Sequence, residues 1–229
     1  MLELREYTSA ELVQILHSTG NQAIERKLQS WGITFSTDRG RGSNKKYTLT
    51  AMDNPFKIYC ITELNIDSRT DFYKLRNCFY YFLNDPEFRN IPDEMKEDYT
   101  DAKDQHISRA SIAKYIKHIS KDDRVLMNGG EYNHYFAYGK TRIFTNEKTY
   151  KEAWNLYWQL ITEAKLNCIE SSGVKYSSIA VSEVIKKYGG VPRKQAKPEL
   201  NVFYNDQLNT LNDYVCAEIE KEVNFKSEY

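Results

Sequence analysis

Four cationic side chains gather in one short segment of this 229-residue chain, where they could bind phosphate. Arg39, Arg41, Lys45 and Lys46 lie within eight residues of the segment DRGRGSNKKYTLT, and no acidic residue separates them. Two glycines in the same segment let the backbone bend easily. Arginine and lysine form charge-assisted hydrogen bonds to phosphate oxygens. The segment therefore predicts a flexible loop that contacts a polyanion.

The cluster does not reflect a generally basic protein. The chain has 32 Lys and Arg against 32 Asp and Glu, so its formal net charge is zero. The charges are nevertheless segregated: residues 84–104 hold eight acids and three cations, whereas residues 186–198 hold five cations and no acid. A neutral protein with separate basic segments can present a local basic face to a polyanion. The alternative is that the acidic segments neutralise these faces in the folded chain.

The residues before the basic segment predict two helices and a strand. Residues 8–18 begin with Thr8 or Ser9 as the N-cap and carry apolar residues at helical spacing. After a glycine turn, residues 21–31 repeat this pattern and end at Gly32. The second helix turns its polar residues outward, and its candidate base contacts are Gln22, Arg26 and Lys27. Residues 33–38 and 46–51 alternate as two strands of a hairpin around the basic segment.

Helix, glycine turn, helix and a hairpin with a basic tip, as in YTSAEL...RKLQSWGI, resembles the winged helix–turn–helix domains of the excisionase and MerR type. The resemblance covers about 45 residues. It implies that the second helix enters the DNA major groove and that the hairpin tip, the wing, grips the DNA backbone. A winged helix that serves protein interaction instead is the alternative.

A second set of candidate contacts follows the acidic stretch. In HISRASIAKYIKHI, isoleucines 107, 112, 116 and 119 form one face of a predicted helix. Residues 125–138 then predict a strand, a Gly-Gly turn and an aromatic strand. This order resembles the recognition helix and wing of bacterial winged-helix regulators and plasmid replication initiators. The resemblance implies these DNA contacts: Arg109, Ser111, Lys114, Tyr115, Lys117, Lys140 and Arg142.

The aromatic strand allows two interpretations. Tyr132, Tyr135, Phe136 and Tyr138 could stack on nucleobases. In an alternating strand, such residues more often form one core face and one exposed face, which is the interpretation we favour.

The rest of the chain predicts mostly helices. Residues 55–64 are a strand candidate, and residues 191–201 are a Pro-containing basic connector. Four further segments have helical patterns: 69–85, 146–165, 177–190 and 205–223. We therefore expect an α+β fold with tandem winged helix–turn–helix units at 1–53 and 54–166 and a helical C-terminal extension at 167–229.

The sequence gives little support to an enzyme, a metal site or a cofactor site. It contains no glycine-rich nucleotide loop and no Gly-x-Ser-x-Gly elbow. The acidic stretch lacks calcium-loop spacing, and the histidines at 106, 118 and 134 match no zinc motif. The four cysteines lie far apart, as in a reduced cytosolic protein. No apolar run is long enough for a membrane span and no secretory signal is evident, so we expect a cytoplasmic location.

The function predicted from these features is binding of double-stranded DNA by a phage or plasmid protein. Its role would be transcription regulation or initiation of replication, and a homodimer is left open. The alternative is a phage- or plasmid-encoded inhibitor that binds a host protein, such as a defence nuclease, in the manner of an anti-CRISPR protein. Such an inhibitor would act through its winged-helix surfaces or through the acidic stretch 84–104.

Overall fold

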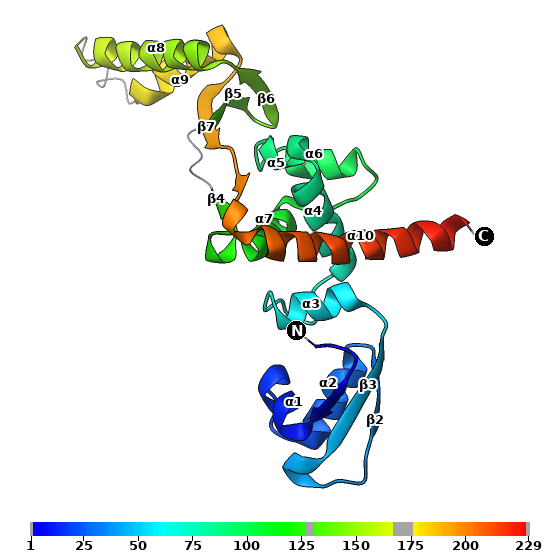
Figure 1. Ribbon diagram of the computed structural model, residues 1–229. Coiled ribbons are helices and arrows are strands. Elements are labelled where there is room, and N and C mark those ends of the chain that lie inside the picture. The colour runs from blue at the N-terminus through cyan, green and yellow to red at the C-terminus, as the bar shows by residue number, and fades with distance from the viewer. Residues whose placement is uncertain (1, 127–130, 167–175, 228–229) are drawn as a thin grey trace. The chain divides into compact units, whose positions relative to one another are not determined.

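A computed structural model describes residues 2–126, 131–166 and 176–227 (Figure 1). The chain forms two compact units, each built from segments that are apart in sequence. Unit 1 comprises Met1–Asp85, Ala110–Arg124 and Asn201–Tyr229, and unit 2 comprises Pro86–Arg109 and Val125–Leu200. Helices and strands are mixed, in agreement with the α+β class. Within the described ranges, no helix has the length and apolar character needed to cross a membrane.

The first part of unit 1 contains the two helices and the two hairpin strands expected from the sequence, together with a short strand before them and a 3-10 turn in the loop. The elements are β1 (Glu6–Thr8), α1 (Ser9–Leu16), α2 (Asn21–Ser30), β2 (Ile33–Thr37), the 3-10 turn η1 (Gly42–Asn44) and β3 (Lys46–Met52). The three strands form an antiparallel sheet in the order β1-β3-β2, and α1 and α2 lie on one face of it (Figure 1). Tyr7, Leu12, Ile24, Leu28 and Tyr47 are buried in the core between these elements.

Local signals explain the ends of these helices. Thr8 is the N-cap of α1, and it forms a reciprocal capping box with Glu11. The turn between α2 and β2 needs Gly32, whose φ of +77° is in the left-handed region. Asn21 is the first residue of α2, and its side chain does not cap that helix but bonds elsewhere.

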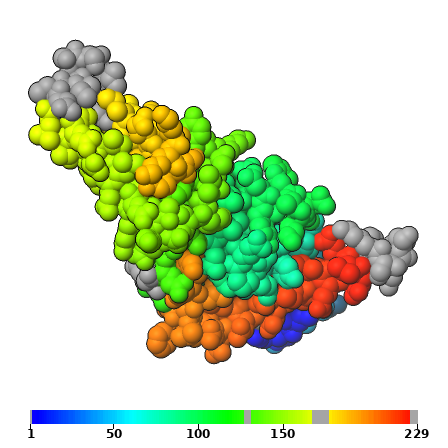
Figure 2. Space-filling view, turned by 90° about the horizontal axis from the view of Figure 1, so that it is seen from above, coloured from blue at the N-terminus to red at the C-terminus, as the bar shows by residue number. Residues whose placement is uncertain are grey.

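The rest of unit 1 is helical. It contains α3 (Pro55–Thr62), α4 (Phe72–Asn84), most of α7 (Arg109–Ile119), the short turns η2 (Lys121–Asp123) and η4 (Val202–Tyr204), and α10 (Asn205–Ser227). α10 packs against α3 and α4, and it is exposed along the side seen in Figure 2. The prediction of a strand at 55–64 was wrong. Asn54 caps a helix there by accepting a hydrogen bond from the Lys57 amide, and Pro55 occupies the first turn, where its missing N–H costs nothing.

Unit 2 contains a three-stranded sheet with the order β6-β5-β7. Its elements are α5 (Pro86–Asn90), α6 (Lys96–Asp101), β4 (Val125–Leu126), β5 (Tyr132–Tyr138), β6 (Thr141–Thr145), α8 (Glu147–Leu166), α9 (Tyr176–Tyr188), β7 (Val191–Ala196) and β8 (Glu199–Leu200). α8 packs along α9, as both views show (Figures 1 and 2). α9 ends at Tyr188, and Gly189 after it has a φ of +80°, in the left-handed region.

Two predictions about the second unit's strands were wrong. The segments 125–126 and 132–138 do not pair with each other: β4 pairs with β8, and β5 pairs with β6 and β7. The hairpin turn is therefore at Gly139, which has a φ of +54°; residues 129 and 130 lie outside the described residues. The basic connector is also a strand, β7, which is joined to β5 over six residue pairs.

Candidate nucleic-acid interface

The outer face of α2 presents polar side chains to solvent. Ile24 and Leu28 are fully buried on the inner face, so helical geometry places Gln22, Arg26 and Gln29 on the other side. All three are exposed. Neither Gln22 nor Arg26 has a hydrogen-bond or ion-pair partner within the described part of the chain. These side chains can therefore reach an external partner without breaking an internal contact.

The basic loop, residues 38–45, is tied at its base by Asp38. The Asp38 carboxylate accepts hydrogen bonds from the amides of Gly40 at 3.0 Å and Lys46 at 2.9 Å. The bond from the Lys46 amide is the main reason why the pKa of this carboxyl is lowered. The loop is thus ordered across its base by a residue that carries a charge opposite to that of its tip.

Asn21 connects the basic loop to the start of α2. Its amide nitrogen donates to the carbonyl of Gly42 at 3.3 Å, and its carbonyl accepts from the hydroxyl of Ser9. Gly42 has a φ of +63°, which favours glycine. A groove runs beside this junction, between α1, α2 and the loop, and is lined by Ser9, Ala10, Val13, Gln14, Gly20, Asn21, Gly42 and Ser43. The loop and the N-terminal half of α2 therefore form one continuous surface.

The four cations of the basic segment differ in their surroundings. Lys45 is only 19% exposed and pairs with Glu25 at 2.7 Å, and this hydrogen bond is the main cause of its raised pKa. Lys46 pairs with Glu6 at 2.8 Å. Arg39 and Arg41 are exposed, and neither has an ion-pair partner among the residues that the structure describes. The two arginines are therefore the cations of this segment that remain available to a ligand.

Lys27 has a structural role. Its ammonium donates hydrogen bonds to the carbonyls of Leu16 at 2.5 Å and His17 at 3.3 Å. Carbonyls at a helix C-terminus lack partners within the helix, and a cation there is favoured by the helix dipole. Lys27 thus caps α1 and does not point away from the protein as Arg26 does.

The second set of predicted contacts is divided between the two units. Ser111, Lys114, Tyr115 and Lys117 belong to unit 1, whereas Arg109, Lys140 and Arg142 belong to unit 2. Lys114 and Lys117 are exposed on α7 and Lys140 is exposed in the β5–β6 turn. The helix and the hairpin that were expected to make a second winged helix therefore do not form one compact unit.

Three members of this second set are occupied by internal contacts. The guanidinium of Arg142 is 10% exposed and bonds to Glu94 and to the carbonyls of Gly139 and Thr141. Arg109 lies 3.8 Å from the same Glu94 carboxylate. Tyr115 is buried in unit 1 and forms a hydrogen bond with Ser111. The acidic stretch thus neutralises part of the basic surface, as one interpretation of the sequence proposed.

The residues that position the basic loop were missed by sequence reasoning. Asp38 and Asn21 have side chains that commonly bond to nearby backbone groups, so their types were a usable signal. Glu25 could not be found in this way, because its contact with Lys45 spans twenty positions in sequence.

Comparisons with known proteins give no relative for this chain. No family model, no curated protein and no solved structure matches it. Among the described residues, no group of three or more His, Cys, Asp or Glu side chains is arranged to hold a metal ion.

Proposed function

We propose that residues 1–53 are a winged helix that binds double-stranded DNA. In this proposal α2 is the recognition helix, and it offers Gln22 and Arg26 to base edges in the major groove. The basic loop is the wing, and it offers Arg39 and Arg41 to backbone phosphates. The wider role we propose is that of a phage or plasmid regulator of transcription or initiator of replication.

The observation that carries the proposal is the junction made by Asn21. It joins the start of α2 to the loop, so the exposed side chains of both elements belong to one surface. A helix fits the major groove, and an adjacent loop then lies over the flanking backbone. Four side chains on this surface form no ion pair with any described residue: Gln22, Arg26, Arg39 and Arg41.

The proposal is tested by removing the two arginines of the loop together. In Arg39→Ala/Arg41→Ala, we expect weaker binding to all duplex sequences. The slope of log affinity against log salt should fall by about 1.8, since each phosphate contact contributes about 0.9. Fluorescence anisotropy with labelled duplex DNA over a range of salt concentrations measures both quantities.

A matched control removes the same charge elsewhere. Lys148 and Lys186 are exposed in unit 2 and have no ion-pair partner among the described residues. Lys148→Ala/Lys186→Ala should keep the parental affinity and slope. Equal losses in the two double variants would mean that total charge matters and the loop does not.

A further inference from the structure

One face of the sheet in unit 2 is covered only in part. Tyr132, His134, Phe136 and Tyr138 alternate along β5 and therefore share a face. Phe136 stacks on Tyr188 of α9 with ring centroids 5.2 Å apart. The other face meets residues 90–94, where Asn133 donates to the carbonyl of Asn90. The first face is thus covered near Phe136, whereas Tyr132 and Tyr138 at the two ends of β5 are exposed.

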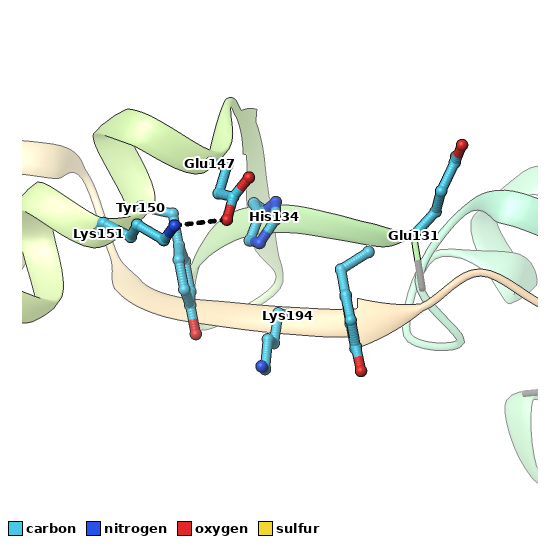
Figure 3. A pocket seen from close by; sticks show the side chains of 7 residues that line it. Glu131, His134, Glu147, Tyr150, Lys151 and Lys194 are labelled. Atoms are coloured by element: carbon cyan, nitrogen blue, oxygen red, sulfur yellow. Dashed lines mark ion pairs between the residues drawn. The ribbon is translucent and has the colours of Figure 1, made fainter. Parts of the chain in front are cut away.

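A pocket lies at the Tyr132 end of this face (Figure 3). We call it the aromatic–lysine pocket, and it has a volume of about 480 Å³. Its lining comes from β5, β7, α8 and the residue before β5: Glu131, Tyr132, His134, Glu147, Tyr150, Lys151 and Lys194. This volume is within the usual range for small-molecule sites, about 300–1,000 Å³.

Three rings line the pocket in a row. The centroid of His134 lies 6.4 Å from that of Tyr132 and 4.6 Å from that of Tyr150. Tyr132 is 41% exposed although it lies in the middle strand of the sheet. Exposed aromatic faces of this kind can stack on flat rings, each contact contributing about 1–3 kcal/mol when the ring is a nucleobase.

Lys194 supplies an available positive charge in the same place. It lies opposite His134 in the β5–β7 register, and its ammonium is 4.6 Å from the centroid of the Tyr132 ring. Figure 3 shows the side chains of Lys194 and Tyr150 extending to the same side of the sheet. Lys194 forms no ion pair with any residue that the structure describes.

The two acids of the pocket are each paired with another lysine. Glu147 pairs with Lys151 at 2.7 Å, and Glu131 pairs with Lys197 at 2.7 Å. The pKa of Glu147 is lowered first by the hydrogen bond from Lys151 and to a lesser extent by the charges of His134 and Lys194. Because both acids are paired with lysines, the ammonium of Lys194 determines which ligand charge the pocket prefers. It disfavours a cationic ligand.

We propose that the aromatic–lysine pocket binds single-stranded nucleic acid, with a base stacked on the tyrosines and a phosphate at Lys194. Aromatic faces beside a cation that has no ion pair are the combination that binds unpaired nucleotides, whose bases are accessible only outside a duplex. The site belongs to unit 2, and it does not rest on the duplex-binding function proposed for residues 1–53.

The test uses the full chain with the loop arginines already removed, Arg39→Ala/Arg41→Ala, so that the basic loop does not contribute. The probe is short fluorescent oligo(dT), and binding is measured by anisotropy. Adding Tyr132→Ala should weaken binding at least about fivefold, the low end of the stacking range. Tyr132→Phe should restore it, because the ring and not the hydroxyl makes the contact.

Matched controls exist for both key residues. Tyr138 is 60% exposed on the same face of β5 but outside the pocket, so Tyr138→Ala should bind like the parent. Lys194→Gln should weaken binding and lower its salt dependence, whereas Lys148→Gln should do neither. The proposal is overturned if Tyr132→Ala binds like the parent, or if Tyr138→Ala loses as much as Tyr132→Ala.

Two competitors identify the ligand class. Unlabelled oligo(dT) should displace the probe at lower concentrations than the same sequence in a duplex. Thymidine monophosphate should compete more weakly than the oligonucleotide, because it offers one base and one phosphate where a strand offers several of each. Competition by the mononucleotide at equal concentration would contradict binding of a strand. Loss of duplex binding by the loop variant bears only on residues 1–53, so the two proposals fail separately.

Discussion

At the scale of residues, a cation's type and position in sequence do not reveal whether it serves the fold or a ligand. Arg26 and Lys27 are neighbours in α2, yet Arg26 is exposed without a partner while Lys27 bonds to the end of α1. The basic segment shows the same contrast between its exposed arginines and its paired lysines. The contacts of each side chain distinguish a structural role from a ligand-binding role. A charge that is already paired inside the protein would have to give up that partner before it could bind a ligand.

Arg26 and Lys27 should therefore respond differently to alanine. Arg26→Ala should lower duplex DNA affinity by about tenfold, within the usual range for a base or phosphate contact, and should leave stability unchanged. Lys27→Ala should lower the local free energy of unfolding by about 1–2 kcal/mol, because two carbonyls lose a charged donor. Hydrogen exchange of the α1 and α2 amides measures the stability. The assigned roles would be contradicted if Lys27→Ala kept the hydrogen-exchange protection of the parent protein but lost tenfold in affinity for duplex DNA.

At the scale of elements, hydrogen bonds from polar side chains hold the basic loop in place beside α2. Asp38 closes the base of the loop, and Asn21 holds its Gly42 carbonyl. A wing ordered in advance loses less conformational entropy on binding than a free loop does. The order of this loop is thus part of the proposed function.

The contribution of Asp38 predicts a pH dependence of the loop. Its pKa is lowered in the fold, chiefly by the Lys46 amide, so the ordering is present above the unfolded value of about 3.9. It is lost as the pH falls through the lower folded value. The NMR shifts of the Gly40 and Lys46 amides should titrate together with a midpoint below about 3.9. Asp38→Asn should abolish that titration, and a midpoint above the unfolded value would refute the assignment.

The elements of residues 1–53 could be predicted because their signals are local. Thr8 as a cap, Gly32 as a helix end and the alternation of residues 46–51 all act within a few positions. The pairing of β4 with β8 and of β5 with β7 could not be predicted in this way. These contacts join residues more than fifty positions apart, and periodicity in one segment says nothing about its partner. Exposed Arg26 and buried Tyr115 were equal candidates in sequence for the same reason.

At the scale of the whole molecule, the chain has zero net charge but segregated acidic and basic segments, and some of these segments contact each other in the fold. Glu94 of the acidic stretch contacts both Arg142 and Arg109, and Asp93 pairs with Lys96. The stretch therefore stabilises unit 2 by its own contacts. Asp93 and Glu94 are therefore already used in contacts inside unit 2 and are less available to a partner protein.

Neutralising Glu94 should weaken unit 2 and leave duplex binding intact. In Glu94→Gln the largely buried Arg142 loses its charged partner, which should lower the local free energy of unfolding by about 1–3 kcal/mol. Hydrogen exchange of the β5 and β6 amides is the measurement. Asp104→Asn is the control, since Asp104 is exposed and forms no ion pair among the described residues. If Glu94→Gln kept the full hydrogen-exchange protection of the β5 and β6 amides, the acidic stretch would not be needed for the stability of unit 2 and could instead bind a partner protein.

The central claim is that residues 1–53 bind double-stranded DNA through α2 and the basic loop. Its most direct test is selection of duplexes from a random-sequence library by the intact protein, followed by affinity measurements across salt concentration. We predict enriched sites and an affinity that falls steeply with salt, with a slope of about 0.9 for each phosphate contact. The absence of duplex binding even at low salt would contradict the claim and would leave α2 and the loop as a protein-docking surface.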